Sequence, residues 1–117
     1  MNPVKVECYA LVQEIVVKRD IFCRCPGCCN LAGAGHHLFK RDRMATAFNT
    51  KYVIGVCVEC HDWARNEADE FREWVLSWMG SNEYYEAWRL SLTVAKHIDF
   101  KQIRDNLKQE LGKYKSA

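Results

Sequence analysis

The sequence predicts a single α+β domain that is mainly helical and is built around one small β-hairpin. Three observations support this prediction: paired cysteines flank a histidine-containing segment, two short segments have strand-like composition, and apolar stripes at helical spacing fill both ends. The 117 residues suffice for one compact domain and are too few for two ordinary ones. We expect an N-terminal helix in 1–20, a metal-binding core in 21–66 and a helical tail in 67–117.

The composition limits the function without selecting one. The hydrophobic fraction of 49% supports a packed core, and the formal charge of +2 neither requires nor excludes a nucleic-acid partner. The seven cysteines are an odd number and no apolar leader precedes them. We therefore expect a reducing compartment, the cytoplasm, where paired cysteines usually bind metal. No apolar run approaches the length of a membrane span, so no membrane partner is expected.

The first predicted element is an amphipathic helix from Pro3 to Asp20. Proline is favoured at the first helical position, where its missing N–H costs nothing. Cys8 lies within the apolar stripe of this helix, so we interpret it as a small buried hydrophobe. The apolar residues that recur at helical spacing are Val4, Cys8, Leu11, Val12, Ile15 and Val16.

The next segment contains a tight turn between two cysteines, Cys25 and Cys28, which enclose Pro26 and Gly27. Proline and glycine favour such a turn, and the turn directs two thiolates toward one metal ion. Cys23 complicates the choice, because Cys23 with Cys28 is a credible alternative pair.

A second Cys-x-x-Cys pair follows about thirty residues later, after a segment that can fold as a hairpin. Four thiolates at this spacing suit tetrahedral coordination of a structural zinc ion. The predicted zinc ligands are Cys25, Cys28, Cys57 and Cys60.

Two strands are predicted between the cysteine pairs. The first runs through 36–39 and places His36 and His37 on opposite faces. The second covers 51–58, is rich in β-branched and aromatic residues, and leads directly into the second cysteine pair and His61.

The helical tail is predicted to contain three helices with aromatic stripes that belong to the core. The first ends at Gly80 and buries a stripe from Phe71 to Met79. Asp99 with Gln102 resembles a capping box, which would begin the last helix. Ser81 can cap the middle helix, and its expected buried residues are Tyr85, Trp88 and Leu92.

The histidines of the core can supply a second, catalytic metal site. If the hairpin lies beside the helix that starts near Cys60, His36 and His61 converge on one divalent ion and His37 stays free. An unliganded imidazole titrates near neutrality and can take a proton from water. The ion would polarise a phosphate and stabilise the leaving oxygen. Magnesium or manganese is expected, and two imidazoles also suit zinc or nickel.

These motifs resemble the HNH (ββα-metal) endonucleases that carry zinc knuckles. The closer resemblance is to the phage NinG-type recombination proteins (the lambda Rap group). It rests on the two cysteine pairs, on Gly35-His36 with the adjacent His37, on Phe48-Asn49 and on the helical tail. The likeness runs from about residue 19 to nearly the C-terminus.

The resemblance implies a hairpin and a helix that clasp a metal ion, with flanking helices. It also implies metal-dependent hydrolysis of DNA, including branched recombination intermediates, in the host cytoplasm if the chain is phage-encoded. By position, His36 matches the first metal ligand of the family, His37 the general base and His61 the distal ligand.

The sequence departs from the family pattern at two positions. Tyr52 stands where the middle asparagine is usual, so Asn49, Tyr52 or a backbone carbonyl could orient the base His37. Arg65 stands where many relatives place a further histidine. The metal shell would then be completed by water, by phosphate or by a carboxylate such as Asp62.

A basic loop follows the first strand, and its expected partners are DNA phosphates. Its position beside the histidines makes Lys40, Arg41 and Arg43 the candidate phosphate contacts. The aromatic C-terminal helices could supply an interface for a homodimer. The alternative function is a non-catalytic zinc module that binds DNA or a recombination protein, and the two departures from the family pattern favour it.

Overall fold

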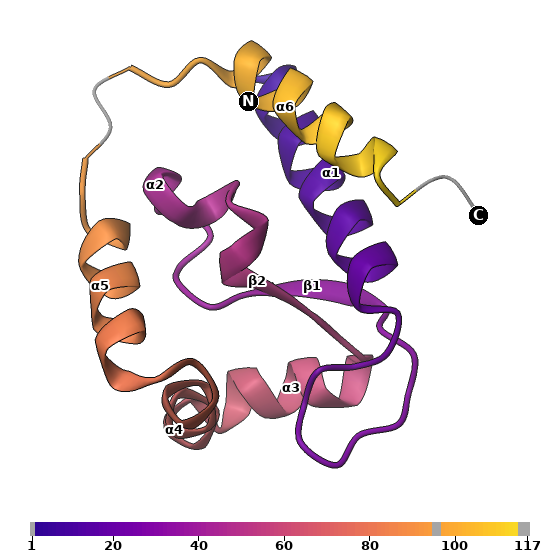
Figure 1. The fold of residues 1–117 in the computed structure, drawn as a ribbon, viewed down its shortest axis with the longest axis vertical. Coiled ribbons are helices and arrows are strands. Elements are labelled where there is room, and N and C mark those ends of the chain that lie inside the picture. The colour runs from indigo at the N-terminus through magenta and orange to yellow at the C-terminus, as the bar shows by residue number, and fades with distance from the viewer. Residues whose placement is uncertain (1, 95–96, 115–117) are drawn as a thin grey trace.

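The computed structural model describes residues 2–94 and 97–114 as helices surrounding a two-stranded sheet (Figure 1). This arrangement confirms the α+β, mainly helical prediction. Within these residues, no helix combines the length and the hydrophobicity that crossing a membrane requires. The elements in chain order are α1 (Pro3–Asp20), β1 (Ala34–His37), α2 (Met44–Ala47), η1 (Thr50–Tyr52), β2 (Val53–Val56), α3 (Val58–Asn66), α4 (Ala68–Met79), α5 (Ser81–Ser91) and α6 (Phe100–Gly112).

Helix α1 has the predicted bounds. Pro3 occupies its first turn, and the side chain of Asn2 accepts a hydrogen bond from the Val4 N–H at 2.9 Å. The predicted stripe is buried along its middle, with Tyr9 added to it, and Cys8 is fully buried as expected. The buried residues of α1 are Cys8, Tyr9, Val12, Ile15 and Val16.

Strands β1 and β2 pair antiparallel, with His36 opposite Ile54 and His37 opposite Val53. The first strand has the predicted length but lies two residues earlier than the predicted 36–39, and the second is shorter than the predicted 51–58. The second begins late because the chain first makes the 3₁₀ turn η1, and it ends early because Cys57 caps α3. The helix predicted to start near Cys60 therefore starts two residues earlier, at Val58.

Side chains of α1 bond to the backbone at both outer edges of the sheet. On β1, the Gln13 side chain accepts from the Gly35 N–H at 2.7 Å and donates to the Gly35 carbonyl at 3.1 Å. On β2, the Asp20 carboxylate accepts from the Gly55 N–H at 2.7 Å. A Cβ atom on Gly35 would lie 3.0 Å from a methyl of Val53 and 3.1 Å from the Gln13 amide. Glycine at position 35 therefore allows α1 to approach the strand that carries His36 and His37.

The core has two parts. One part contains Cys23, Cys25, Cys57, Ile54 and residues of α3, α4 and α5. The other contains α1, Phe48, Val53 and two leucines of α6. Helices α1 and α6 lie side by side on this second part, at the right of Figure 1. Because Ile54 and Val53 alternate along β2, one short hairpin contributes to both parts.

Helix α5 corrects one prediction. Tyr85, Trp88 and Leu92 were expected to be buried, but they are 50%, 42% and 47% exposed. The buried residues of this helix are Tyr84, Ala87 and Ser91. Two of them are small, and they allow α5 to pack closely against its neighbours α4 and α2. The aromatic stripe predicts one face of the helix, and packing buries the adjacent face.

Helix α4 buries only part of its predicted stripe, because Trp78 is 43% exposed, and α6 begins as predicted. Phe71 and Val75 of α4 are buried, and Gly80 ends the helix with a φ of 93°, which glycine adopts readily. The Asp99 side chain accepts from the Gln102 N–H at 3.0 Å and caps α6, as the capping-box pattern indicated.

The C-terminal end of α1 is anchored by Asp20, whose side chain is 4% exposed. Its carboxylate accepts from Arg19 at 2.8 Å, from Arg24 at 3.2 Å and from the Gly55 N–H. Burial by itself would raise the pKa of Asp20, but the hydrogen bonds from Arg19 and Gly55 outweigh it and lower the pKa. The ionised form is therefore favoured by folding.

We expect Asp20→Asn to lower the free energy of unfolding by about 3 kcal/mol, because it leaves partly buried guanidinium groups without their anion. Asp105→Asn is the matched control, since Asp105 is 59% exposed and pairs only at the surface with Arg104; its effect should stay within about 0.5 kcal/mol. Urea unfolding measures both changes. Because the folded pKa of Asp20 is lowered, the difference between wild type and Asp20→Asn should narrow as the pH falls below about 4. Equal stability of the wild type and the Asp20 variant at neutral pH would contradict this role.

Candidate metal centre and histidine cleft

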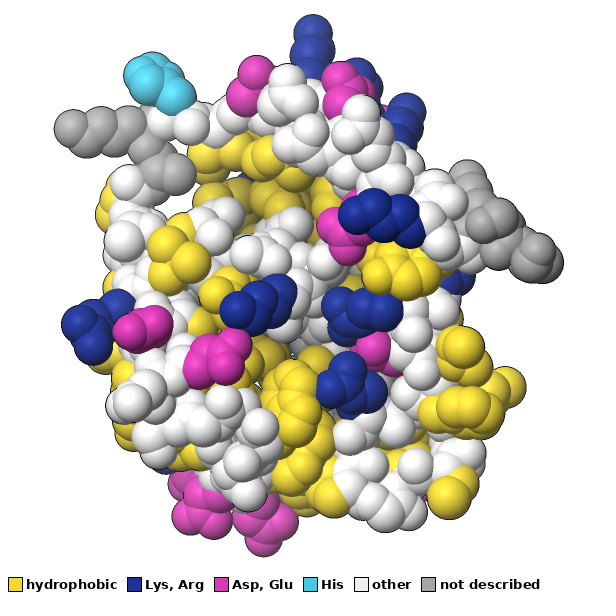
Figure 2. All heavy atoms as spheres, viewed as in Figure 1, with side chains coloured by type: hydrophobic (Ala, Val, Ile, Leu, Met, Phe, Trp, Pro, Cys, Tyr) yellow, Lys and Arg dark blue, Asp and Glu magenta, His cyan; other side chains and the backbone are white. Residues whose placement is uncertain are grey.

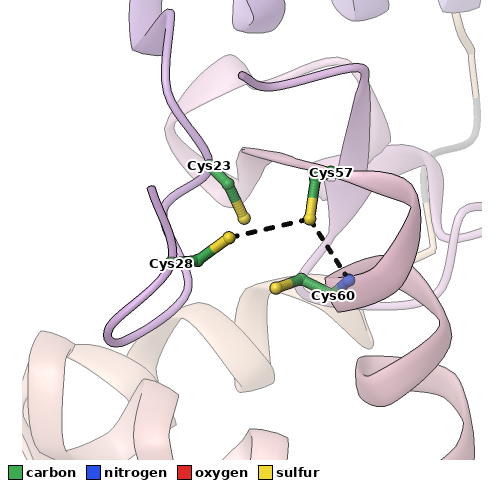
Figure 3. A group of neighbouring side chains, drawn as sticks. All are labelled: Cys23, Cys28, Cys57 and Cys60. Carbon is green, nitrogen blue, oxygen red and sulfur yellow. Dashed lines mark hydrogen bonds between the residues drawn. The ribbon is translucent and has the colours of Figure 1, made fainter. Parts of the chain in front are cut away.

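Four cysteine thiols gather beside the N-terminus of α3 (Figure 3). Their sulfur atoms all lie within 4.8 Å of one another. Cys23 and Cys28 come from the loop between α1 and β1, and Cys57 and Cys60 come from the first turn of α3 and its cap. Among the described residues this is the single group that brings together three or more ligand atoms from histidine, cysteine or carboxylate side chains.

The group has the dimensions of a structural metal site. Tetrahedral zinc with Zn–S bonds of about 2.3 Å separates its sulfur ligands by about 3.8 Å, and the Sγ atoms of Cys28 and Cys57 lie 3.7 Å apart. Cys57 Sγ also accepts from the Cys60 N–H at 3.4 Å and from the Asn30 amide at 3.6 Å. The four residues thus fit a tetrahedral ion that prefers thiolate ligands.

The environment of Cys57 favours its thiolate, the form that binds metal. The N–H of Cys60 is the main cause, and the Asn30 amide adds to it, so that the pKa of Cys57 falls to about 6. Burial instead raises the pKa of Cys60. A cation bound among the four sulfurs would compensate the burial of their charges.

The structure corrects one predicted ligand. It brings Cys28, Cys57 and Cys60 together as expected, but it places Cys23 with them and leaves Cys25 outside the group. Cys25 is instead the first residue of the Pro-Gly turn, where its carbonyl accepts from the Cys28 N–H at 3.2 Å and Gly27 has a φ of 72°. Its thiol is buried next to the group, and burial is the main cause that raises its pKa to about 12.

Zinc content distinguishes the two cysteines. The loss of a residue that only supports a metal ligand weakens metal binding by roughly 10–100-fold. We expect Cys23→Ser, which removes a ligand, to weaken zinc binding by more than this. Cys25→Ser should retain one zinc ion per chain. Elemental analysis after dialysis against a competing chelator measures both. Loss of zinc from the Cys25 variant, with retention by the Cys23 variant, would restore the pairing predicted from the turn.

The three histidines of the core meet in a second place, a cleft of about 660 Å³ between α1, β1 and α3. His36 and His37 come from β1, and His61 comes from α3. The alternation of β1 turns His36 toward Phe71 and His37 toward Tyr9, as predicted for adjacent strand residues. Both rings nevertheless line the same cleft with His61.

His36 and His61 lie close enough to share an ion. Their ring centroids are 5.1 Å apart, and the rings are nearly perpendicular. Burial is the main cause that lowers the pKa of His36 to about 4, with the charges of His61, His37 and Arg65 adding to it. The His36 ring therefore stays neutral at pH 7, which is the form that binds a metal ion.

His37 is held by a backbone carbonyl. Its Nε2 lies 2.9 Å from the carbonyl oxygen of Ala47 in α2. A carbonyl can only accept, so Nε2 carries the proton and Nδ1 keeps the lone pair. Burial is the main cause that lowers the pKa of His37. A neutral imidazole with a fixed tautomer is the arrangement that a general base requires.

The side chains of Asn49 and Tyr52, which were considered as partners that orient His37, make other contacts. Asn49 is exposed, and its side chain caps η1 by accepting from the Lys51 N–H at 3.1 Å. Tyr52 packs edge-on against Phe39. Of the three groups considered as the partner of His37, the backbone carbonyl is the one that makes the contact, through Ala47. A catalytic role for Asn49 stays a prediction, and its side chain bonds to the Lys51 N–H in this structure.

The predicted phosphate contacts divide among different surfaces. Arg41 lines the histidine cleft, whereas Lys40 lines a neighbouring hollow and Arg43 donates to the Ser91 hydroxyl of α5 at 3.2 Å. Arg65 also lines the cleft and was not predicted to do so. Its spacing was the available clue, because residues four apart share one face of a helix and His61 is four residues earlier.

Two histidines are the protein ligands that this cleft offers to an ion. In the described part of the chain, no carboxylate or third imidazole joins His36 and His61 in a three-ligand group, and Asp62 is not among the residues that line the cleft. The remaining positions would be open to water or to oxygen atoms of a substrate.

Comparison of the chain with family models, with curated proteins and with solved structures finds no match.

Proposed function

We propose that the protein is a metal-dependent DNA endonuclease of the HNH type. The observation that carries this proposal is the convergence of His36, His37 and His61 in one cleft beside a four-thiol site. In this proposal Cys23, Cys28, Cys57 and Cys60 hold a structural zinc ion, and β1, β2 and α3 form the hairpin-helix unit that the sequence resemblance implies.

Each histidine has a role that its environment supports. His36 and His61 would hold a divalent ion, which would supply charge neutralisation at the phosphate and at the leaving oxygen. His37 accepts the proton of the attacking water at Nδ1, because its Nε2–H is engaged by Ala47. Two imidazole ligands suit manganese, nickel or zinc as well as magnesium. The attack of water on the phosphodiester breaks the P–O bond to the sugar.

A cleavage assay tests this function. Plasmid and synthetic branched DNA are incubated with wild type, His36→Ala and His61→Ala, each with confirmed zinc content, in magnesium, manganese or excess chelator. We expect cutting by the wild type that requires an added divalent ion and falls in both variants. Activity on branched DNA above that on plasmid would support a role in recombination. Absence of cutting with every ion tested, by folded and zinc-loaded protein, would reject the proposal.

The second candidate is a non-catalytic zinc module that binds DNA or a recombination protein. Two observations favour it: among the described residues no third protein ligand joins His36 and His61, and the Asn49 side chain bonds to the Lys51 N–H. DNA binding that survives both histidine substitutions, without cutting under any condition, is the result expected for such a module.

A further inference from the structure

Among the residues that the structure describes, the histidine cleft is lined by cations and by no carboxylate. Its charged lining residues are Arg41 and Arg65, and the remaining titratable side chains are the three histidines and Tyr9. Asp69 lines a neighbouring hollow, but its carboxylate is paired with Arg72 at 3.4 Å. The cleft is therefore electropositive and attracts anions.

Both arginines are positioned toward this cleft. The Arg41 guanidinium lies 4.2 Å from the ring centroid of Tyr9, and the Tyr9 hydroxyl donates to the Arg41 carbonyl at 2.9 Å. Arg65 lies one helical turn beyond His61 on α3. Within residues 2–94 and 97–114, neither guanidinium forms an ion pair, in contrast to Arg19, Arg24 and Arg72.

A different face of the protein shows cations that are paired with acidic side chains. Figure 2 shows a face where Lys and Arg side chains gather around a hollow, but acidic side chains lie among them and no histidine appears at its centre. A second hollow of the protein is lined by Arg19, Arg24, Lys51 and Glu83 among others, and Lys51 pairs with Glu83 at 3.1 Å. Its cations are largely neutralised within the protein, whereas those of the histidine cleft are not.

A divalent ion that enters the histidine cleft alone meets two unfavourable conditions. It receives only neutral ligands from His36 and His61, and it is repelled by two guanidinium groups. A phosphodiester reverses both conditions, because its oxygens accept from arginine and also bind the ion. Binding of the phosphodiester should therefore raise the affinity of the cleft for the divalent ion, and binding of the ion should raise its affinity for the phosphodiester.

We propose that Arg41 and Arg65 bind the DNA phosphodiester and that His36 and His61 bind the divalent ion only together with that phosphate. The identity of the anion as DNA rests on the proposed function. Arg65 then contacts the substrate directly. By binding the phosphate, it brings a phosphate oxygen to the ion in place of a further protein ligand. By linkage, DNA must raise the affinity for the ion by the same factor as the ion raises the affinity for DNA.

Manganese binding tests the mutual dependence without a cleavage readout. Zinc-loaded His37→Ala protein is titrated with Mn²⁺, and free Mn²⁺ is followed by its paramagnetic resonance, with and without a short DNA duplex. We expect DNA to increase the Mn²⁺ affinity by about tenfold or more. Equal Mn²⁺ affinity in the presence and absence of DNA would overturn the proposal.

The salt dependence of DNA binding tests the arginines. In buffer without added divalent ion, the slope of log affinity against log salt should decrease in magnitude by about 0.9 in Arg65→Gln and also in Arg41→Gln, since each loses one phosphate contact. Arg89→Gln is the matched control, because Arg89 is exposed on α5 and does not line the cleft. An unchanged slope in Arg65→Gln, with the fold verified by thermal unfolding, would contradict its role.

These outcomes are separate from those of the cleavage assay. Coupled binding of DNA and Mn²⁺ without cutting would sustain the phosphate site and reject the nuclease. Cutting by a protein whose Mn²⁺ affinity is independent of DNA would sustain the nuclease and reject the phosphate-completed metal site.

Discussion

Removal of the metal from the four-thiol group is expected to unfold the protein. Structural zinc in small domains contributes roughly 10 kcal/mol or more to folding, which is comparable with the whole stability of a domain of this size, about 5–15 kcal/mol. The loop that carries Cys23 and Cys28 has no helix or extended strand of its own, and these two sulfurs lie within 4.8 Å of those of Cys57 and Cys60 at the start of α3. Loss of the ion would therefore release both the loop and the first turn of α3.

Two variants make this expectation specific. Cys57→Ser removes a ligand and also the sulfur that accepts from the Cys60 N–H, so it should abolish the cooperative thermal transition. Cys29→Ser is the control, because Cys29 is exposed and lies outside the group; its transition should match that of the wild type. Far-UV circular dichroism during chelation and zinc re-addition measures the effect. A chelated protein with no zinc and an unchanged melting temperature would contradict a structural metal.

Substitution of His37 is expected to have the largest effect on activity. The loss of a general base costs about 10²–10⁴-fold in rate. His37→Gln is the sharper variant, since its amide can still donate to the Ala47 carbonyl while it offers no basic nitrogen. We therefore expect His37→Gln to keep the melting temperature of the wild type and to lose the cleavage that the wild type shows.

His97 supplies the matched histidine control. It is exposed and lies outside the cleft, so His97→Ala should retain the wild-type rate. Rates are compared at a saturating divalent ion concentration, so that a change in metal affinity is not mistaken for a change in proton transfer. Wild-type cleavage by His37→Gln would exclude His37 as the base and direct attention to a water molecule activated in another way.

Local patterns were enough to predict the helices at both ends of the chain. The bounds of α1 follow from Pro3 and an apolar stripe, and the start of α6 follows from Asp99 and Gln102. Each of these features is a contact between residues at most one or two turns apart, so the sequence contains both partners side by side. The burial of Cys8 followed from the same periodicity.

The pairings across the chain depended on the tertiary structure. The spacing of cysteines predicted a four-thiol site but selected Cys25, and only the path of the loop places Cys23 beside Cys57. Likewise, the aromatic stripe predicted the wrong face of α5, because the buried face is set by what α4 and α2 can accommodate.

The sequence by itself determined that three histidines and the second cysteine pair would be carried by a hairpin and the helix after it, with the first cysteines in the segment before the hairpin. It could not determine what orients His37, because the partner is the Ala47 carbonyl and a backbone group has no residue type to recognise. Nor could it show that Arg65 faces the histidines. Periodicity and caps are set by hydrogen bonds within a few residues, whereas the composition of a cleft is set by which distant segments the core brings together.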